Sequence, residues 1–354
     1  MKISFESDYC NGAHPAVLNR LVATNDEPSG TYGSDRWSER AREKIRHATG
    51  CSQARVEFLA GGTQTNATIL DAILAPGEGV IAVPTAHIEV HEAGAIEASG
   101  HKVILLRDST GTVERHGLMT VVDLEQYLDD FTADPTREHR VQPGAVYITV
   151  PSELGTLYTA AEIEGIYNIC QHYGLKLYTD GARLAYALAS NECEYDLAWL
   201  AHHCDAMYIG GTKCGALMGE AAVFPRGDAP RAFFSTIKRH GALLAKSRLA
   251  GVQFDALFSD GLYERIGRHA VDLALELRSH FMSAGYEMYG ASVTNQQFVV
   301  LPNAVISQLT ERYIFEQWGP LDNERTVCRF VTSWSTTDED VASLGADLAR
   351  IVKA

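Results

Sequence analysis

The chain has 354 residues, of which 46% are hydrophobic and 21% charged, and its formal net charge is −15. This composition is typical of a globular protein, and at about 150 residues per domain the length indicates two domains. The net negative charge disfavours binding to nucleic acid or to an anionic membrane surface, and no apolar run is long enough to span a bilayer. The seven cysteines are scattered without a CxxC pair, so we expect a protein of the reducing cytoplasm.

Short apolar runs alternate with helical segments through the first two thirds of the chain. In chain order, strands are predicted at 79–84, 103–106, 145–149, 175–179, 206–209 and 221–224, and helices at 87–98, 124–131 and 160–172. Continuous apolar strands that alternate with helices are typical of a largely parallel sheet covered on both faces. The fold class expected for this part is therefore α/β.

After about residue 230 the pattern changes. Pro230 could open a helix at its first position, and helical periodicity continues from there to His280. Two strands, 297–301 and 326–332, and an amphipathic helix, 337–352, are predicted to follow. We interpret residues 1–240 as an N-terminal segment with a large domain, and residues 241–354 as a smaller α+β domain.

A glycine-rich turn and an aspartate suggest a site for an anionic, planar ligand. Gly61-Gly62-Thr63 opens a helix, where free backbone N–H groups and the helix dipole favour a phosphate, although a plain helix cap has the same sequence. Asp180 follows a predicted parallel strand, and ligands bind at the carboxyl ends of such strands. Its carboxylate could keep a ring nitrogen protonated, or the residue could belong to an ordinary Asp-Gly turn.

A lysine and a histidine add reactive groups. Lys213 lies among glycines just past a strand, and a lysine in a confined, desolvated site has a lowered pKa and can form a Schiff base. A surface lysine on a loop is the alternative. His87 follows the strand at 79–84 and could stack on a planar ring. His87, His91 and Glu92 could instead bind a metal, but a zincin needs its acid directly after the first histidine, where this chain has Ile88.

Taken together, these segments carry a family resemblance. A phosphate-binding turn, a histidine, an aspartate and a lysine 33 residues further on resemble the order found in fold type I pyridoxal phosphate enzymes. More narrowly, the chain resembles a divergent branch of the L-threonine aldolase family of β-eliminating lyases. The likeness lies in 62–66, His87 with 92–94, 180–183, 212–213, Ser7-Asp8, 31–35 and 329–332. The segments 151–156 and 241–246 depart from the family pattern, which puts the substrate in doubt.

The resemblance implies a fold type I large domain and a set of site residues. Lys213 would carry pyridoxal 5'-phosphate and Asp180 and His87 would contact its ring. Gly62, Thr63, Thr212 and Arg183 would complete the cofactor site, with Lys238 or Arg239 added from a neighbouring subunit. The substrate carboxylate would bind Arg183, Arg329 and Ser7, and Tyr32 would reach the site from the partner.

The activity that the resemblance implies is cleavage of an L-β-hydroxy-α-amino acid to glycine and an aldehyde by a homodimer or homotetramer with shared active sites. The general base stays open between His87, His139 and a water molecule. Glu153 is either a specificity determinant or a solvated loop acid. Other fold type I reactions are the main alternative, namely racemisation, β-elimination or transamination. A metallohydrolase and a non-catalytic binding protein are further alternatives.

Overall fold

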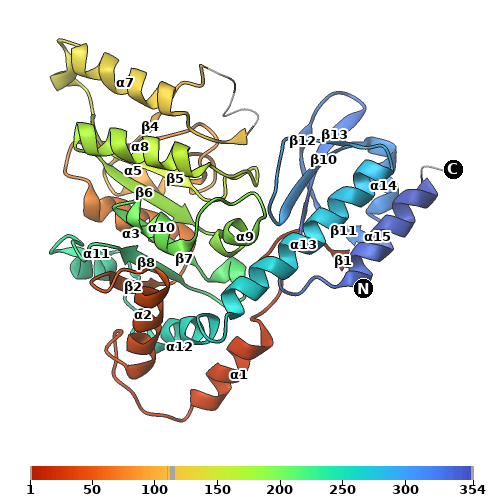
Figure 1. The fold of residues 1–354 in the computed structure, drawn as a ribbon, viewed down its shortest axis with the longest axis horizontal. Helices are drawn as coiled ribbons and strands as arrows, with labels where there is room; N and C mark the ends of the chain where they lie inside the picture. Colours follow the sequence, from red (N-terminus) through yellow and green to blue (C-terminus); the bar gives the residue numbers. More distant parts are fainter. Residues whose placement is uncertain (1, 110, 112–115, 352–354) are drawn as a thin grey trace.

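Within the residues that the computed structural model describes, 2–109, 111 and 116–351, a seven-stranded sheet forms the centre of the larger lobe (Figure 1). Its strands, in spatial order, are β2 (Arg55–Leu59), β8 (Glu220–Phe224), β7 (Ala206–Gly210), β6 (Lys176–Gly181), β5 (Gln142–Thr149), β3 (Glu78–Ala82) and β4 (Lys102–Leu105). Neighbouring strands from β7 to β4 are parallel, and β8 is antiparallel to both β7 and β2. The predicted, mainly parallel sheet is confirmed.

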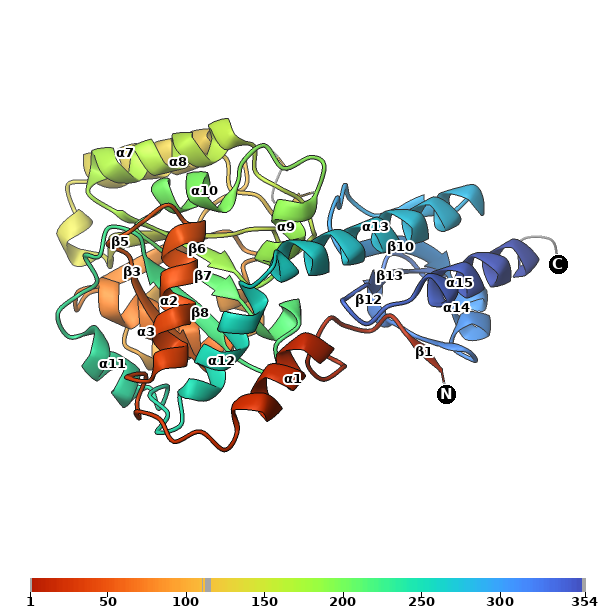
Figure 2. The ribbon, with the colours of Figure 1, turned by 60° about the horizontal axis from the view of Figure 1, so that its bottom comes forward.

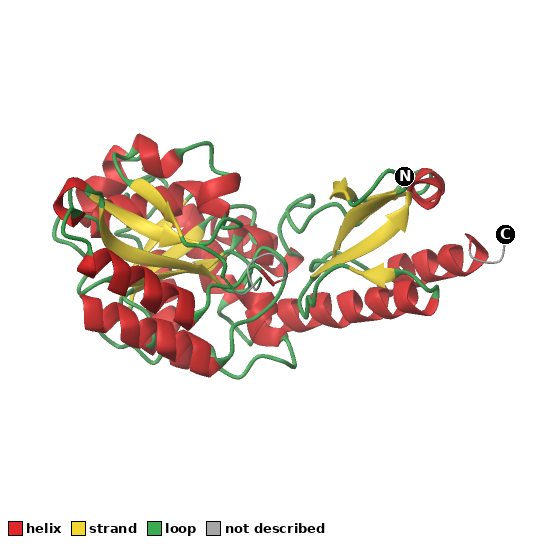
Figure 3. Ribbon diagram, turned by 90° about the horizontal axis from the view of Figure 1, so that it is seen from above, coloured by secondary structure: helices red, strands yellow, loops and turns green. Residues whose placement is uncertain are grey.

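Helices lie on both sides of this sheet (Figure 3). They are α2 (Arg36–Ala48), α3 (Gly62–Ile73), α7 (Val121–Ala133), α8 (Ala160–Tyr173), α9 (Leu184–Ala189), α10 (Leu197–His202), α11 (Phe233–Arg239) and α12 (Arg248–Leu257). The predicted helices 124–131 and 160–172 lie within α7 and α8. Each begins after a threonine, Thr120 or Thr159, whose hydroxyl accepts a backbone N–H three residues further on. Such caps fix where a helix starts.

Two helical predictions are wrong in detail. The segment 87–98 forms two short helices, α4 (His87–Val90) and α5 (Ala95–Ala98), rather than one. Ala93 and Gly94 between them have φ angles of +51° and +71°, which a continuous right-handed helix does not allow. Pro230 does not open a helix, because its carbonyl accepts the N–H of Phe233 in a turn before α11 begins.

The smaller lobe has an antiparallel sheet of its own, separate from the large one (Figure 3). Its strands, in spatial order, are β12 (Glu316–Pro320), β13 (Arg325–Val331), β10 (Gln296–Pro302) and β9 (Glu287–Met288), and its helices are α14 (Asn303–Leu309) and α15 (Asp338–Ile351). The N-terminal strand β1 (Ile3–Ser4) pairs in parallel with β11 (Tyr313–Ile314) of this lobe. The chain then passes to α1 (Pro15–Thr24), beneath the larger lobe (Figure 2).

The long helix α13 (Leu262–Ser283) connects the two lobes (Figures 1 and 2). Its first half packs into the core of the larger lobe through Ile266 and Val271, and its second half packs into the other core through Leu277 and Phe281. The domain boundary at residue 240 stays a prediction, but the two cores meet within α13. None of the described helices combines the length and the apolar character that crossing a membrane requires.

Candidate active site

A cavity of about 470 Å³ lies at the carboxyl ends of the parallel strands and is lined by residues from both lobes. This edge of an open α/β sheet is where ligands generally bind. The cavity brings together eight of the residues predicted for the site, which are Gly62, Thr63, His87, Asp180, Arg183, Thr212, Lys213 and Arg329. Of these, only Arg329 belongs to the smaller lobe.

One end of the cavity has the features of an anion site. Helix α3 begins at Gly62 after Gly61, without a side-chain cap, so its first N–H groups have no capping side chain. A Cβ at Gly62 would lie 3.3 Å from the hydroxyl of Tyr208, so glycine keeps this edge of the cavity open. Thr63 and Thr212 line the same cavity. Uncapped N–H groups and hydroxyls are what a phosphate requires.

Asp180 is held rigidly at the end of β6. Its Oδ2 accepts hydrogen bonds from the Tyr147 hydroxyl (2.6 Å) and from Asn66 Nδ2 (3.0 Å), and its Oδ1 accepts the backbone N–H of Ala182 (2.9 Å). The residue is buried. Three donors stabilise a carboxylate in an apolar setting, so Asp180 fits a partner that carries a protonated ring nitrogen.

Lys213 lies on the short helix η2 (Thr212–Cys214), between β7 and β8. Burial and the nearby Arg183 charge lower the pKa of its amine, which favours the neutral, nucleophilic form. The preceding glycines are sterically required, because a Cβ at Gly210 would lie 2.2 Å from the carbonyl oxygen of Ala182. Lys213 therefore meets the chemical requirement for covalent attachment to an aldehyde.

His87 begins α4 and is held at two atoms. Its Nδ1 lies 2.7 Å from Glu92 Oε1, which also accepts a hydrogen bond from Asn66 Nδ2 (2.8 Å). Its backbone N–H donates to Glu153 Oε1 at 2.8 Å. A carboxylate that accepts from Nδ1 leaves Nε2 of the ring as the acceptor. No group of three potential metal ligands occurs in the described ranges, so the metallohydrolase alternative gains no ligand set from His87 and His91.

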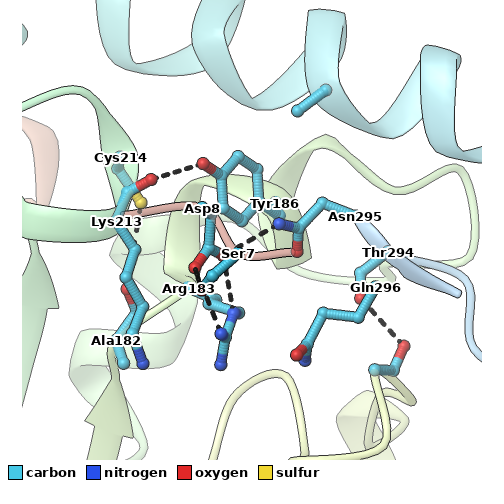
Figure 4. Close-up of polar contacts among 12 residues, drawn as sticks. Ser7, Asp8, Ala182, Arg183, Tyr186, Lys213, Cys214, Thr294, Asn295 and Gln296 are labelled. Carbon is cyan, nitrogen blue, oxygen red and sulfur yellow. Dashed lines mark hydrogen bonds and ion pairs between the residues drawn. The ribbon is translucent and has the colours of Figure 1, made fainter. Parts of the chain in front are cut away.

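The two arginines predicted to bind a substrate carboxylate each contact a carboxylate of their own chain. Arg183 donates to Asp8 through Nε (2.7 Å) and Nη2 (3.1 Å), and Asn295 donates to the same carboxylate at 2.9 Å (Figure 4). Although burial opposes it, the Arg183 and Lys213 charges lower the pKa of Asp8. Arg329 forms an ion pair with Glu316 and donates to Gln296 Oε1 at 3.0 Å.

The cavity does not include the other predicted site residues. Ser7 lies next to Asp8, with its hydroxyl 3.5 Å from Asp8 Oδ1 (Figure 4). Tyr32 is exposed, and the Lys238 ammonium lies 4.7 Å from the centroid of its ring. Arg239 forms an ion pair with Asp71. His139 is exposed on η1 (Arg137–His139), outside the cavity.

Several cavity residues were not singled out from sequence. Glu220 opens an apolar strand, and Glu316 and Trp318 lie two apart on an edge strand. Tyr147, which supports Asp180 from outside the cavity lining, stands within an apolar strand. The one available signal was an acid at the start of an otherwise apolar strand, as at Glu220. Glu153 is not a solvated loop acid, because burial raises the pKa of its carboxyl and Thr149 and His87 donate to it.

A mainly parallel sheet with an uncapped helix start, a hydrogen-bonded aspartate and a partly buried lysine at one edge is the arrangement expected of a pyridoxal phosphate enzyme of fold type I. Residues 4–300 match the model of the family described as β-eliminating lyase. The chain belongs to that family, and it is a pyridoxal phosphate-dependent lyase with a threonine aldolase-like function.

Similar proteins agree with this assignment. The chain is 29% identical to the low specificity L-threonine aldolases of Pseudomonas sp. strain NCIMB 10558 and of Pseudomonas aeruginosa, with 99% of this chain and 98% of each relative covered. The solved structure of Leishmania major threonine aldolase has a TM-score of 0.94 at 36% identity, with 99% of both chains covered. Thermus thermophilus aspartate aminotransferase, with a TM-score of 0.67 at 14% identity over 99% of this chain and 91% of that one, shares the fold.

Proposed function

We propose that this enzyme cleaves L-β-hydroxy-α-amino acids of the threonine, allo-threonine or phenylserine type to glycine and an aldehyde. The observation that carries the proposal is the meeting of Lys213, Asp180, His87 and Arg329 in one cavity. The similarity to threonine aldolases along the whole chain supports it.

The cofactor would be held by residues whose donors suit its parts. Lys213 would bind it covalently, Asp180 would pair with its ring nitrogen, and His87 would contact its ring. Gly62, together with Thr63 and Thr212, would bind the phosphate. Pyridoxal phosphate, when bound, supplies an electron sink for the bond that breaks at the α-carbon.

The chain's own residues then orient the substrate and accept a proton. Arg183 and Arg329 would bind the α-carboxylate, because a guanidinium fixes a planar carboxylate in one orientation. Cleavage of the Cα–Cβ bond requires loss of the β-hydroxyl proton. Of the two histidines considered for this step, His87 lies in the cavity and His139 does not. We therefore assign the proton to His87 Nε2, the ring nitrogen opposite the Glu92 contact.

We also propose a homodimer or homotetramer in which Tyr32 and a basic residue, Lys238 or Arg239, serve the partner's site. Tyr32 and Lys238 contact one another on the surface, away from the cavity of their own chain. The assay is subunit mixing. A Lys213→Ala variant and a Tyr32→Ala/Lys238→Ala variant should each be inactive, and together they should regain activity after dissociation and reassociation. No recovery would refute shared sites.

The proposed location is the cytoplasm. All seven cysteines are free thiols, and a reducing compartment keeps them so. Cys10 is exposed and Cys193 is partly exposed, so an oxidising compartment would leave these two open to reaction.

The deciding experiment for the activity combines a spectrum with a product assay. The purified enzyme should show a visible absorption band that borohydride abolishes and that changes when glycine is added, and Lys213→Ala should lack it. Threonine and phenylserine should then release an aldehyde. If amino acids without a β-hydroxyl were turned over instead, the activity would be racemisation, elimination or transamination, and the aldolase proposal would fail.

A further inference from the structure

The two arginine–carboxylate pairs of the site differ in how firmly the carboxylate is held. Asp8 has a side chain with 0% of its surface exposed, and it accepts two hydrogen bonds from Arg183 and one from Asn295. Glu316 has a side chain that is 41% exposed, and its ion pair is with Arg329. Displacing Asp8 from Arg183 would therefore break a buried network, whereas displacing Glu316 from Arg329 would break one ion pair of a side chain that solvent already reaches.

The position of Glu316 follows from the register of the smaller sheet. Glu316 on β12 is directly opposite Arg329 on β13, and opposite residues on one face of an antiparallel pair are close enough for an ion pair. The Arg329 side chain is 10% exposed, and Gln296 and the Trp318 ring, 5.2 Å away, hold its guanidinium in place. The arginine is thus held in place, while the side chain of its carboxylate partner lines the cavity and is 41% exposed.

The nearby charges favour an incoming anion that replaces Glu316 on Arg329 over one that binds Arg329 alongside Glu316. Burial lowers the pKa of the Arg329 guanidinium, and the charge of a second cation nearby, Arg183, lowers it further. Each cation has one carboxylate of the chain beside it. A further carboxylate on Arg329, with Glu316 still present, would put two anions side by side on one guanidinium, and like charges at that distance repel.

We propose that Glu316 is a competing carboxylate that occupies Arg329 until the α-carboxylate of an amino acid displaces it. Glu316 thereby sets the affinity for substrate and for the product glycine. The inference rests on the proposed function in so far as an amino acid binds with its carboxylate at Arg329. It concerns binding and not the bond that is broken, so it also applies if the chemistry at the α-carbon differs.

The test compares glycine with ethanolamine, in which CH₂OH replaces the carboxylate, on the holoenzyme. Dissociation constants are measured from the ligand-induced change in the visible spectrum for the wild type, Glu316→Gln and Glu287→Gln. Glu287 is the matched control, because it is an exposed acid of β9 in the same sheet, lies outside the cavity, and is 3.7 Å from Arg325. Glu316→Gln should bind glycine about fivefold more tightly, the factor that corresponds to about 1 kcal/mol for a partly exposed ion pair.

Each outcome separates this inference from the proposed function. The competition predicts that Glu316→Gln binds glycine more tightly than the wild type does, and ethanolamine equally well. It also predicts that Glu287→Gln binds glycine as the wild type does. Equal or weaker glycine binding in Glu316→Gln would overturn it, and so would equal tightening for ethanolamine. A wild type that responds to glycine but releases no aldehyde from threonine would refute the aldolase proposal and leave the competition standing.

Discussion

Glu220 provides a quantitative test of the electrostatics of the site. It opens β8 beside the lysine-bearing turn, is 3% exposed, and accepts the backbone N–H of Gly211 at 2.9 Å. Burial raises the pKa of its carboxyl from 4.5 to about 7, against the hydrogen bonds from Thr212 and Gly211 and the charge of Lys213, which lower it. The folded protein therefore binds this proton more tightly than the unfolded chain does.

The sign of the stability change follows from linkage. Below pH 4.5 the carboxyl is protonated in both states, so it causes no loss of stability. Between pH 4.5 and about 7 the unfolded chain loses the proton first, so the free energy of unfolding falls as pH rises, and the loss is complete above about 7. A difference of about 2.5 pH units at about 1.4 kcal/mol each gives a loss of about 3 kcal/mol.

Replacing the carboxyl by an amide should remove this loss. We expect Glu220→Gln to equal the wild type in stability near pH 4.5 and to exceed it by up to about 3 kcal/mol at pH 8. The assay is urea unfolding followed by circular dichroism from pH 5 to 8, on cofactor-free protein so that no cofactor titrates in the same range. Glu164→Gln, on the exposed face of α8, controls for the change in net charge. Parallel curves for wild type and Glu220→Gln would refute the reasoning.

Three further predictions concern catalysis. Asp180→Asn should lower kcat/KM for threonine about 100-fold or more at saturating cofactor, because a fixed charge is lost where the ring nitrogen would lie; a loss below tenfold would exclude that role. His87→Ala should lower kcat/KM at least about 100-fold, whereas His139→Ala should stay within about twofold, and steady-state rates of the two variants decide between these bases. Arg183→Lys should raise KM about tenfold with a smaller effect on kcat, because lysine cannot contact Asp8 and a substrate carboxylate through one planar group; an unchanged KM would argue against carboxylate binding there.

The parts of the fold that could be predicted are those in which one short segment is sufficient. Strands such as β5 and β7 contain continuous apolar runs, because helices cover both faces, and such runs are visible in sequence. β2 could not be predicted in this way, since Arg55 and Glu57 alternate with Val56 and Phe58 at the edge of the sheet. The break in the helix at 87–98 depends on the backbone angles of Ala93 and Gly94, of which only the glycine gives a sequence signal.

The site shows the same division between local and distant information. Lys213, Asp180 and the Gly61-Gly62 turn could be found because each stands next to a strand end or a helix start. Their supports could not be found, because they come from elsewhere in the chain. The Asp180 carboxylate depends on Tyr147 and on Asn66, 114 residues away, and only the folded sheet brings these donors to it.

The two arginines show that a residue of the expected type in the expected place can already have a partner that the sequence does not reveal. By sequence, Arg183 and Arg329 share one role, binding of the substrate carboxylate, and Arg183 has a second role in the cofactor site. In the structure Arg183 is hydrogen-bonded to Asp8, 175 residues away in the chain, and the Asp8 side chain is fully buried. Arg329 instead faces a glutamate whose side chain is 41% exposed, across one strand pair. An incoming carboxylate can replace the second partner far more easily than the first. Arg329 is therefore the arginine whose own-chain partner a substrate carboxylate would displace, whereas Arg183 would bind that carboxylate while still paired with Asp8.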